Sequence, residues 1–178
     1  MFYSQRDKRW KNVKIGESKS TIGGHGCCLC SALMVLSKFY PFHNLTPDLV
    51  ASLWKFVAIQ DDPDPKYISW TQAKFKGMKF LWRNGDFQPE RIITDPRTGL
   101  DMTEEAILKN SCASRDYGVI IQVRNPDGSQ HWQYLRGKSL LGWTTVDPWT
   151  GQIRWKGFGF GTPYPRCTAW VLFQKTNI

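Results

Sequence analysis

The sequence lacks an apolar segment long enough to cross a membrane. Its longest apolar-rich stretch, residues 29–36, is interrupted by a serine, whereas a spanning helix needs roughly 18 apolar residues. The N-terminal residues also lack the apolar core and the small-residue cleavage site of a secretory signal. We therefore expect no membrane insertion and a cytoplasmic product, which a separate pore must release if it acts outside the cell.

The sequence also lacks the dispersed, even-numbered cysteines of a disulfide scaffold. It has five cysteines, and three of them fall within four residues, which favours reduced thiols. Cys27 and Cys30 have the spacing of a redox site, but the residues before them are typical of a loop and not of a strand. A zinc site that added His25 and Cys167 to these two cysteines would lack a second paired cluster. We therefore expect no metal or other cofactor, and we interpret Cys30, Cys112 and Cys167 as small buried hydrophobes.

Length and composition predict one globular domain. The 178 residues are enough to bury a core without disulfides or metals, and the apolar fraction of 41% is in the globular range. The 24 basic and 15 acidic side chains leave a net charge of +9. This excess of positive charge favours an anionic partner, such as nucleic acid, a membrane surface or an acidic wall polymer. The alternative is that the basic side chains only form a solvated surface. The nine tryptophans can stack on sugars or bases, although most tryptophans belong to a core.

Apolar periodicity predicts one long buried helix in the N-terminal third. Four large side chains recur at helical spacing, namely Leu29, Leu33, Leu36 and Tyr40. The helix should begin at Cys27, after an irregular arm over residues 1–25, and stop at Pro41. The glycine-rich end of the arm, residues 23–26, can adopt backbone angles closed to other residues. Shorter helices are predicted over residues 47–55, with a proline in first position, and 103–109, with acidic side chains in the first turn.

The last third of the sequence is typical of β-strands. Strands are predicted over residues 119–123, 131–135, 143–146, 152–156 and 169–175, with turns at 125–128 and 147–151. Residues 61–65 are predicted to be a loop, and residues 66–100, rich in aromatic and basic side chains, receive no assignment beyond turns. The order of elements predicts an α+β fold, in which the N-terminal helix packs on a C-terminal antiparallel sheet.

Three residues from separate segments have the chemistry of a cysteine nucleophile and its base. Cys27 stands at the predicted start of the long helix, where the helix dipole favours a thiolate. His131 opens a strand and could accept the thiol proton, and Asp147 follows at the end of the next strand. Since two adjacent antiparallel strands would bring His131 and Asp147 together, the carboxylate could fix the orientation of the imidazole. Gln5 carries an amide that could donate to a developing oxyanion.

Taken together, these residues resemble a known family. The matching segments are Tyr3-Ser4-Gln5-Arg6-Asp7 with Trp10, Thr21-Ile22-Gly23, Gly26-Cys27, His131-Trp132, and Asp147-Pro148 with Gly151. They are similar to the C39-like peptidases, which are papain-like cysteine peptidases related to the bacteriocin-leader-processing domain of certain ABC transporters. The resemblance covers both ends of the chain and leaves an insertion at about residues 56–115 unmatched.

The resemblance implies a papain-like domain over the whole chain, residues 1–178, with a defined set of site residues. Cys27 would be the nucleophile, and His131 would act first as general base and then as general acid. Asp147 would orient the imidazole, while Gln5 and the backbone N–H of Cys27 would hold the oxyanion. The family usually has a small residue after the nucleophile, where this sequence has Cys28, so both cysteines remain candidates. We favour Cys27 because it directly follows a glycine.

Each polar candidate also has a plainer interpretation. His25 lies in a loop and would then simply be exposed, while His43 in a turn is interpreted as structural. Alone, His131 would be an ordinary strand-end histidine, and Gln5 a polar surface residue. Asp147 precedes a proline, and Asp-Pro favours a turn on its own. Only their combination with a nucleophile favours catalysis.

The predicted reaction is acyl transfer through a cysteine thioester, without a metal or an organic cofactor. A basic, tryptophan-rich chain with neither a transporter nor a signal suits a phage lysin, which would cut peptide bonds in peptidoglycan and bind anionic wall polymer. Two alternatives remain. One is a peptidase that processes a phage or host protein inside the cell. The other is a non-catalytic papain-like module that binds nucleic acid or another anion through its basic surface.

Overall fold

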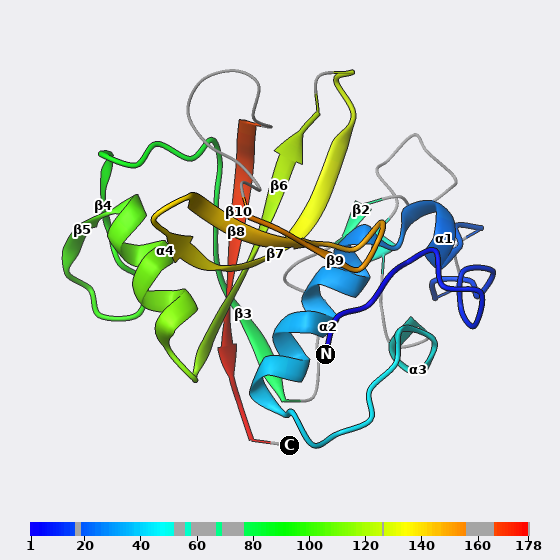
Figure 1. Cartoon of the computed structure of the whole chain (residues 1–178). Helices are drawn as coiled ribbons and strands as arrows, with labels where there is room; N and C mark the ends of the chain where they lie inside the picture. The colour runs from blue at the N-terminus through cyan, green and yellow to red at the C-terminus, as the bar shows by residue number, and fades with distance from the viewer. Residues whose placement is uncertain are drawn as a thin grey trace.

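The computed structural model is a mixed structure of helices and a large antiparallel sheet (Figure 1). It describes residues 1–16, 19–51, 77–125, 127–155 and 166–177, together with the backbone of residues 56–57 and 67–68. The predicted α+β class is confirmed. The predicted loop at residues 61–65 lies outside the described residues.

The helices are α1 (Ile22–His25), α2 (Cys27–Phe39), α3 (Pro47–Ala51) and α4 (Glu104–Ala113). The main sheet consists of β3 (Met78–Asn84), β6 (Tyr117–Arg124), β7 (Gln130–Ser139), β8 (Gly142–Asp147), β9 (Gln152–Arg154) and β10 (Arg166–Lys175). Two small antiparallel pairs are formed by β1 (Phe56–Val57) with β2 (Tyr67–Ile68) and by β4 (Ile92–Thr94) with β5 (Asp101–Thr103).

The main sheet has the order β3-β10-β6-β7-β8-β9, and all neighbours are antiparallel. Four of the predicted strands are found in β6, β7, β8 and β10, each longer than predicted. The predicted strand 152–156 is found as β9, which ends at Arg154, and residue 156 lies outside the described residues. The unmatched segment 56–115 supplies β3, which forms one edge of this sheet.

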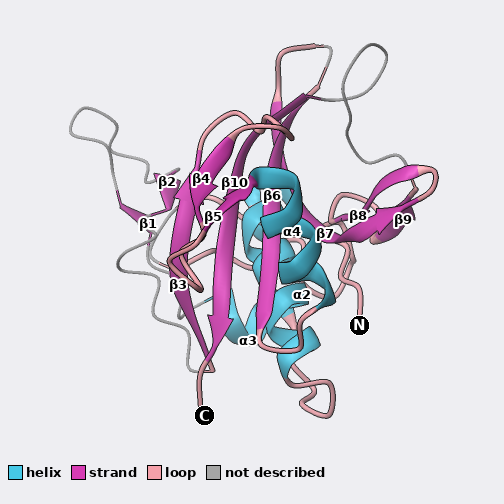
Figure 2. Cartoon of the chain, turned by 90° about the vertical axis from the view of Figure 1, so that its left-hand side faces the viewer, coloured by secondary structure: helices cyan, strands magenta, loops and turns pink. Residues whose placement is uncertain are grey.

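Side chains on both faces of the sheet are buried. One face carries Ile120 and Val171 and packs against α2, while the other carries Val119 and Ile121 and packs against α4. Figures 1 and 2 show the two helices against the central strands. A strand that is buried on both faces is apolar at consecutive positions. This explains why β6 contains an unbroken run of valine and isoleucine rather than an alternation.

The helices agree with the periodicity and with the capping residues. α2 ends at Phe39, directly before the residue that precedes Pro41. α3 begins at Pro47 as predicted, and its predicted continuation to residue 55 lies outside the described residues. The Thr103 side chain caps α4, which extends to Ala113, four residues further than predicted. Of the helices in the described residues, none is long and apolar enough to span a membrane.

The described part of the N-terminal arm is irregular as predicted up to Thr21, but residues 22–25 form a short helix and the arm contributes to the core. Tyr3, Trp10 and Ile15 are buried against α2, and the Trp10 indole N–H donates to the Ser4 carbonyl over 2.7 Å. The arm then enters the short helix α1, whose N-cap is Thr21. Large apolar side chains spaced along an irregular segment therefore form a wall of the core that local periodicity does not detect.

The glycines before α2 do not use the backbone angles that are closed to other residues. Neither Gly23 nor Gly26 has a positive φ, and φ is −79° at Gly26. Glycine is needed there for close packing instead. A Cβ at Gly26 would lie 2.4 Å from the Ile22 carbonyl oxygen, and one at Gly23 would lie 2.7 Å from that of Lys11. The two glycines thus let the arm, α1 and the start of α2 approach closely.

Candidate active site

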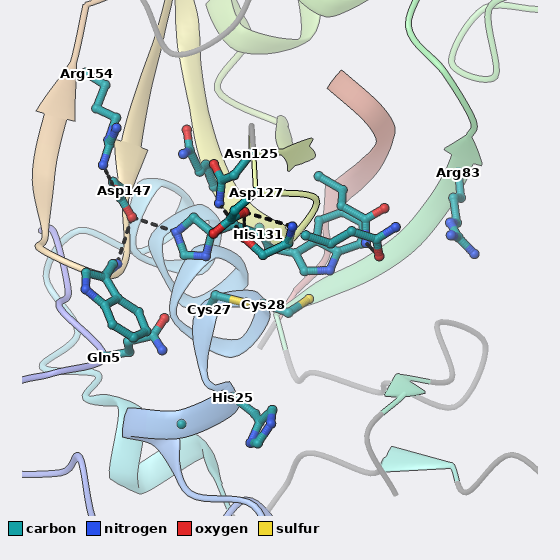
Figure 3. A pocket seen from close by; sticks show the side chains of 17 residues that line it. Gln5, His25, Cys27, Cys28, Arg83, Asn125, Asp127, His131, Asp147 and Arg154 are labelled. Atoms are coloured by element: carbon teal, nitrogen blue, oxygen red, sulfur yellow. Dashed lines mark hydrogen bonds and ion pairs between the residues drawn. The ribbon is translucent and has the colours of Figure 1, made fainter. Parts of the chain in front are cut away.

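Cys27 occupies the first position of α2 and faces a pocket. The first backbone N–H groups of a helix have no partner within the helix, and the helix dipole there favours an anion. The Cys27 side chain is half-buried and lines the pocket together with side chains of β7 and β8 (Figure 3). The fold therefore presents this sulfur to solvent at a position that stabilises negative charge.

His131 and Asp147 come from the neighbouring strands β7 and β8. Tyr134 pairs with Val146, and this register brings the start of β7 next to the end of β8. Nε2 of His131 lies 2.6 Å from Oδ1 of Asp147. Cys27 lies close enough to His131 to contribute to raising the pKa of the imidazole, and both side chains line the same pocket. Because Nε2 faces the carboxylate, the sulfur faces the Nδ1 edge, and Figure 3 shows the imidazole between the two side chains.

The surroundings of His131 favour its charged form. Burial alone would lower the pKa of His131, but the hydrogen bonds and negative charges of Asp147 and Cys27 raise it from 6.5 to about 9. Burial would raise the pKa of Asp147, whereas hydrogen bonds from His131 and the Trp149 N–H hold it below its usual range. The positive charges of His131 and Arg154 act in the same direction. The site thus places a carboxylate and an imidazolium beside a thiol.

Asp147 is buried, and both of its carboxylate oxygens have partners. Besides His131, Oδ1 accepts the backbone N–H of Trp149 over 2.9 Å, and Oδ2 forms an ion pair with Arg154. Arg154 lies on β9, which forms a hairpin with β8 around the turn at Gly151, where φ is +73°. Arg154 was not predicted as a site residue. The turn signal at residues 147–151 could have identified it, since a hairpin there places the next strand beside Asp147.

Gln5 lies in the wall of the pocket that Cys27 also lines. It is buried, its backbone N–H donates to the Pro148 carbonyl over 2.6 Å, and Nε2 donates to the Gly23 carbonyl over 3.1 Å. These bonds tie the arm to the turn after β8 and to α1. A side-chain amide nitrogen has a second N–H. Gln5 lines the pocket with Cys27, and among the described residues its buried Oε1 has no hydrogen-bond partner.

The other cysteines of the cluster lie in the core. Cys28 and Cys30 are buried, and burial raises the pKa of both thiols, with a further contribution from charge at Cys27. A thiol that stays protonated is a poor nucleophile. Although Cys28 touches the pocket wall, the geometry favours Cys27 as the nucleophile.

The residues of the alternative zinc site do not come together in the structure. Cys30 lies in the apolar cluster on the α2 face of the sheet, and Cys167 lies in the cluster on the α4 face. Within the described residues, no group of three or more histidine, cysteine or acidic side chains is placed to share a metal ion.

The pocket around Cys27 has a volume of about 840 Å³. His25 is exposed on its wall, whereas His43 lies elsewhere and packs edge-on against Tyr40, with ring centroids 5.5 Å apart. Several further lining side chains were not predicted, among them Arg83, Asn125, Asp127, Ser129 and Trp149. Most of them lie on loops or on an edge strand, and only the tertiary fold brings them together.

The sequence matches no protein-family model, and neither a curated protein nor a solved structure shows significant similarity to the chain. The function must therefore be argued from the geometry and chemistry of the site itself.

Proposed function

We propose that this protein is a papain-like, C39-like cysteine peptidase that hydrolyses amide bonds through a thioester at Cys27. The observation that carries the proposal is that Asp147, His131 and Cys27 line one pocket, with His131 hydrogen-bonded to Asp147 and Cys27 at the N-terminus of a helix. A nucleophile, a base within hydrogen-bond reach and a group that orients the base are what acyl transfer requires. The packing of α2, which carries the nucleophile, on the sheet that carries the base supports the papain-like arrangement.

In the proposed reaction, the Cys27 thiolate attacks the carbonyl carbon of the amide. His131 gives its proton to the nitrogen, and the C–N bond breaks to release an amine and leave a thioester. Neutral His131 then takes a proton from water, whose oxygen attacks the thioester and releases the carboxylic acid and the thiolate. Asp147 orients the ring and stabilises its charged form, while Gln5 and the Cys27 backbone N–H hold the oxyanion.

We further propose that the substrate is the peptide of peptidoglycan. Five exposed basic side chains of the N-terminal arm support an approach to anionic wall polymer: Arg6, Lys8, Arg9, Lys11 and Lys14. The guanidinium of Arg6 stacks over Trp149, 3.9 Å from the ring centroid, and Trp149 lines the pocket. Basic charge therefore adjoins the proposed site. In this proposal the protein is a phage-type lysin that reaches the wall from the cytoplasm through a separate pore.

Digestion of purified peptidoglycan tests this substrate. We expect the protein to release new free amino groups without new reducing sugar ends, because amide hydrolysis frees amines whereas glycoside hydrolysis frees reducing ends. The matched control is Cys27→Ala, which should release neither. A different result would support a protein-processing peptidase. In that case the walls stay intact, and Cys27→Ala captures an intracellular protein that the unmodified enzyme cleaves.

Alkylation kinetics test the catalytic pair without any substrate. We expect iodoacetamide to label Cys27 below pH 7 at least about tenfold faster than an ordinary thiol with a pKa of about 8.5, because the His131 imidazolium stabilises the thiolate. His131→Ala should remove this advantage. Mass spectrometry assigns the labelled site, and buried Cys28 provides an internal reference. Labelling of Cys27 at the ordinary rate, accompanied by salt-dependent binding of nucleic acid, would favour the non-catalytic module.

A further inference from the structure

A cationic side chain faces the pocket from β3, across from the elements that carry the acid and the base. Arg83 is exposed and lines the pocket wall. Its register partner on β10 is Val171, which points into the apolar cluster beneath α2. Register partners in an antiparallel pair share a face, so Arg83 lies on the face of the sheet that α2 covers. Figure 3 shows Arg83 beyond Cys28, on the side away from Asp147.

The charge of Arg83 is not neutralised by the described part of the chain. Other charged side chains of the pocket have partners: Arg154 pairs with Asp147, and Asp127 accepts hydrogen bonds from Ser129. No carboxylate among the described residues lies within ion-pair distance of Arg83. A guanidinium in this position is therefore available to an anionic group in the pocket.

The field of Arg83 reaches the interior of the site. Burial is the main cause that raises the pKa of Cys28, and the charge of Arg83 acts against it. The guanidinium is thus close enough to act on a group next to the proposed nucleophile.

The stereochemistry of acyl transfer indicates which part of a substrate would meet Arg83. The tetrahedral intermediate carries the sulfur, the oxyanion, the leaving nitrogen and the acyl chain. Gln5 attracts the oxyanion and His131 protonates the nitrogen, so the acyl chain takes the direction away from both. In Figure 3, Gln5 and Asp147 lie on one side of Cys27, whereas Cys28 and Arg83 lie on the other. An acyl chain that extends away from Gln5 would therefore run toward Arg83.

We propose that Arg83 binds a carboxylate on the acyl side of the scissile bond, so that the enzyme selects acidic peptides. The inference rests on the proposed amide hydrolase function and names the substrate class. A planar guanidinium matches a carboxylate through two parallel hydrogen bonds, which a carboxamide cannot replace. In peptidoglycan, the glutamyl residue of the stem peptide supplies such a carboxylate when it is not amidated.

Paired peptidyl chloromethyl ketones test this assignment on the intact protein. Each pair differs only by Glu or Gln at the first, second or third position on the acyl side, and mass spectrometry measures the rate of Cys27 alkylation. We expect the Glu reagent to react about three- to tenfold faster at one position, as a charge-assisted pair at an exposed site allows. Arg83→Gln should abolish the preference, and Arg83→Glu should reverse it in favour of a lysine reagent.

The control is Arg115→Gln, which removes an exposed arginine that does not line the pocket and should keep the preference. Equal rates for Glu and Gln at all three positions, or a preference that survives in Arg83→Gln, would overturn the assignment while leaving the hydrolase proposal intact. Failure of every reagent to alkylate Cys27 would overturn the hydrolase proposal, and with it this inference. Stem peptides with a free or amidated glutamyl carboxylate then show whether the wall supplies the preferred anion.

Discussion

Replacement of Cys27 by alanine is expected to lower the rate of amide hydrolysis by at least about a thousandfold, whereas Cys28→Ala retains activity within a few-fold. The two cysteines are adjacent in the sequence but differ in their surroundings. Cys27 is half-buried and lines the pocket beside His131, while Cys28 is 4% exposed and burial raises the pKa of its thiol. Only Cys27 lies both next to a base and in a position that a substrate in the pocket can reach.

The pair of variants also separates catalysis from folding. Loss of a buried sulfur at Cys28 should cost about 1 kcal/mol of unfolding free energy, whereas Cys27→Ala should leave the denaturation midpoint almost unchanged. Release of amino groups from peptidoglycan measures activity, and chemical denaturation measures stability. Full activity in Cys27→Ala combined with inactive, folded Cys28→Ala would transfer the role of nucleophile to Cys28.

The local parts of the fold and site were accessible from the sequence because each rests on a short-range rule. Helical spacing of leucines located α2, and Pro47 marked the start of α3. Two predicted strands joined by a loop were enough to place His131 near Asp147, since hairpin partners lie side by side. These signals depend on residues within 16 positions of one another, the separation of His131 and Asp147.

The parts that were missed depend on distant segments. β10 inserts between β3 and β6, so the edge strand that carries Arg83 joins the sheet only through the last strand of the chain. In β3, Phe80, Leu81 and Trp82 follow one another, so the segment lacks the alternation of apolar and polar residues that identifies a half-buried strand. The close approach at Gly26 depends on how α1 meets α2, and a glycine alone does not distinguish close packing from a positive φ.

Replacement of Asp147 by asparagine should shift the alkaline limit of activity to lower pH. Asp147 raises the pKa of His131 through its hydrogen bond and its charge, against the lowering effect of burial, so that His131 loses its proton as the pH rises through about 9. Without that charge, the pKa of the imidazole should fall by at least about one unit toward its ordinary value of about 6.5. The protonated form that must give its proton to the leaving amine is then lost at lower pH. We also expect kcat/KM at its optimum to fall by about a hundredfold or more, because a neutral amide no longer stabilises the imidazolium.

The neighbouring ion pair gives this prediction a matched control of opposite sign. Arg154 contacts Oδ2 of Asp147 and makes no contact with the imidazole that the structure records, so Arg154→Gln removes a positive charge near His131 without removing the carboxylate. The pKa of His131 should then stay near 9 or rise slightly, and the alkaline limb of the kcat/KM profile should not move to lower pH. A profile in which both variants lose activity at the same lower pH would indicate a general disturbance of the β8–β9 hairpin. An alkaline limb that stays in place in Asp147→Asn would show that a group other than the His131–Asp147 pair limits activity at high pH.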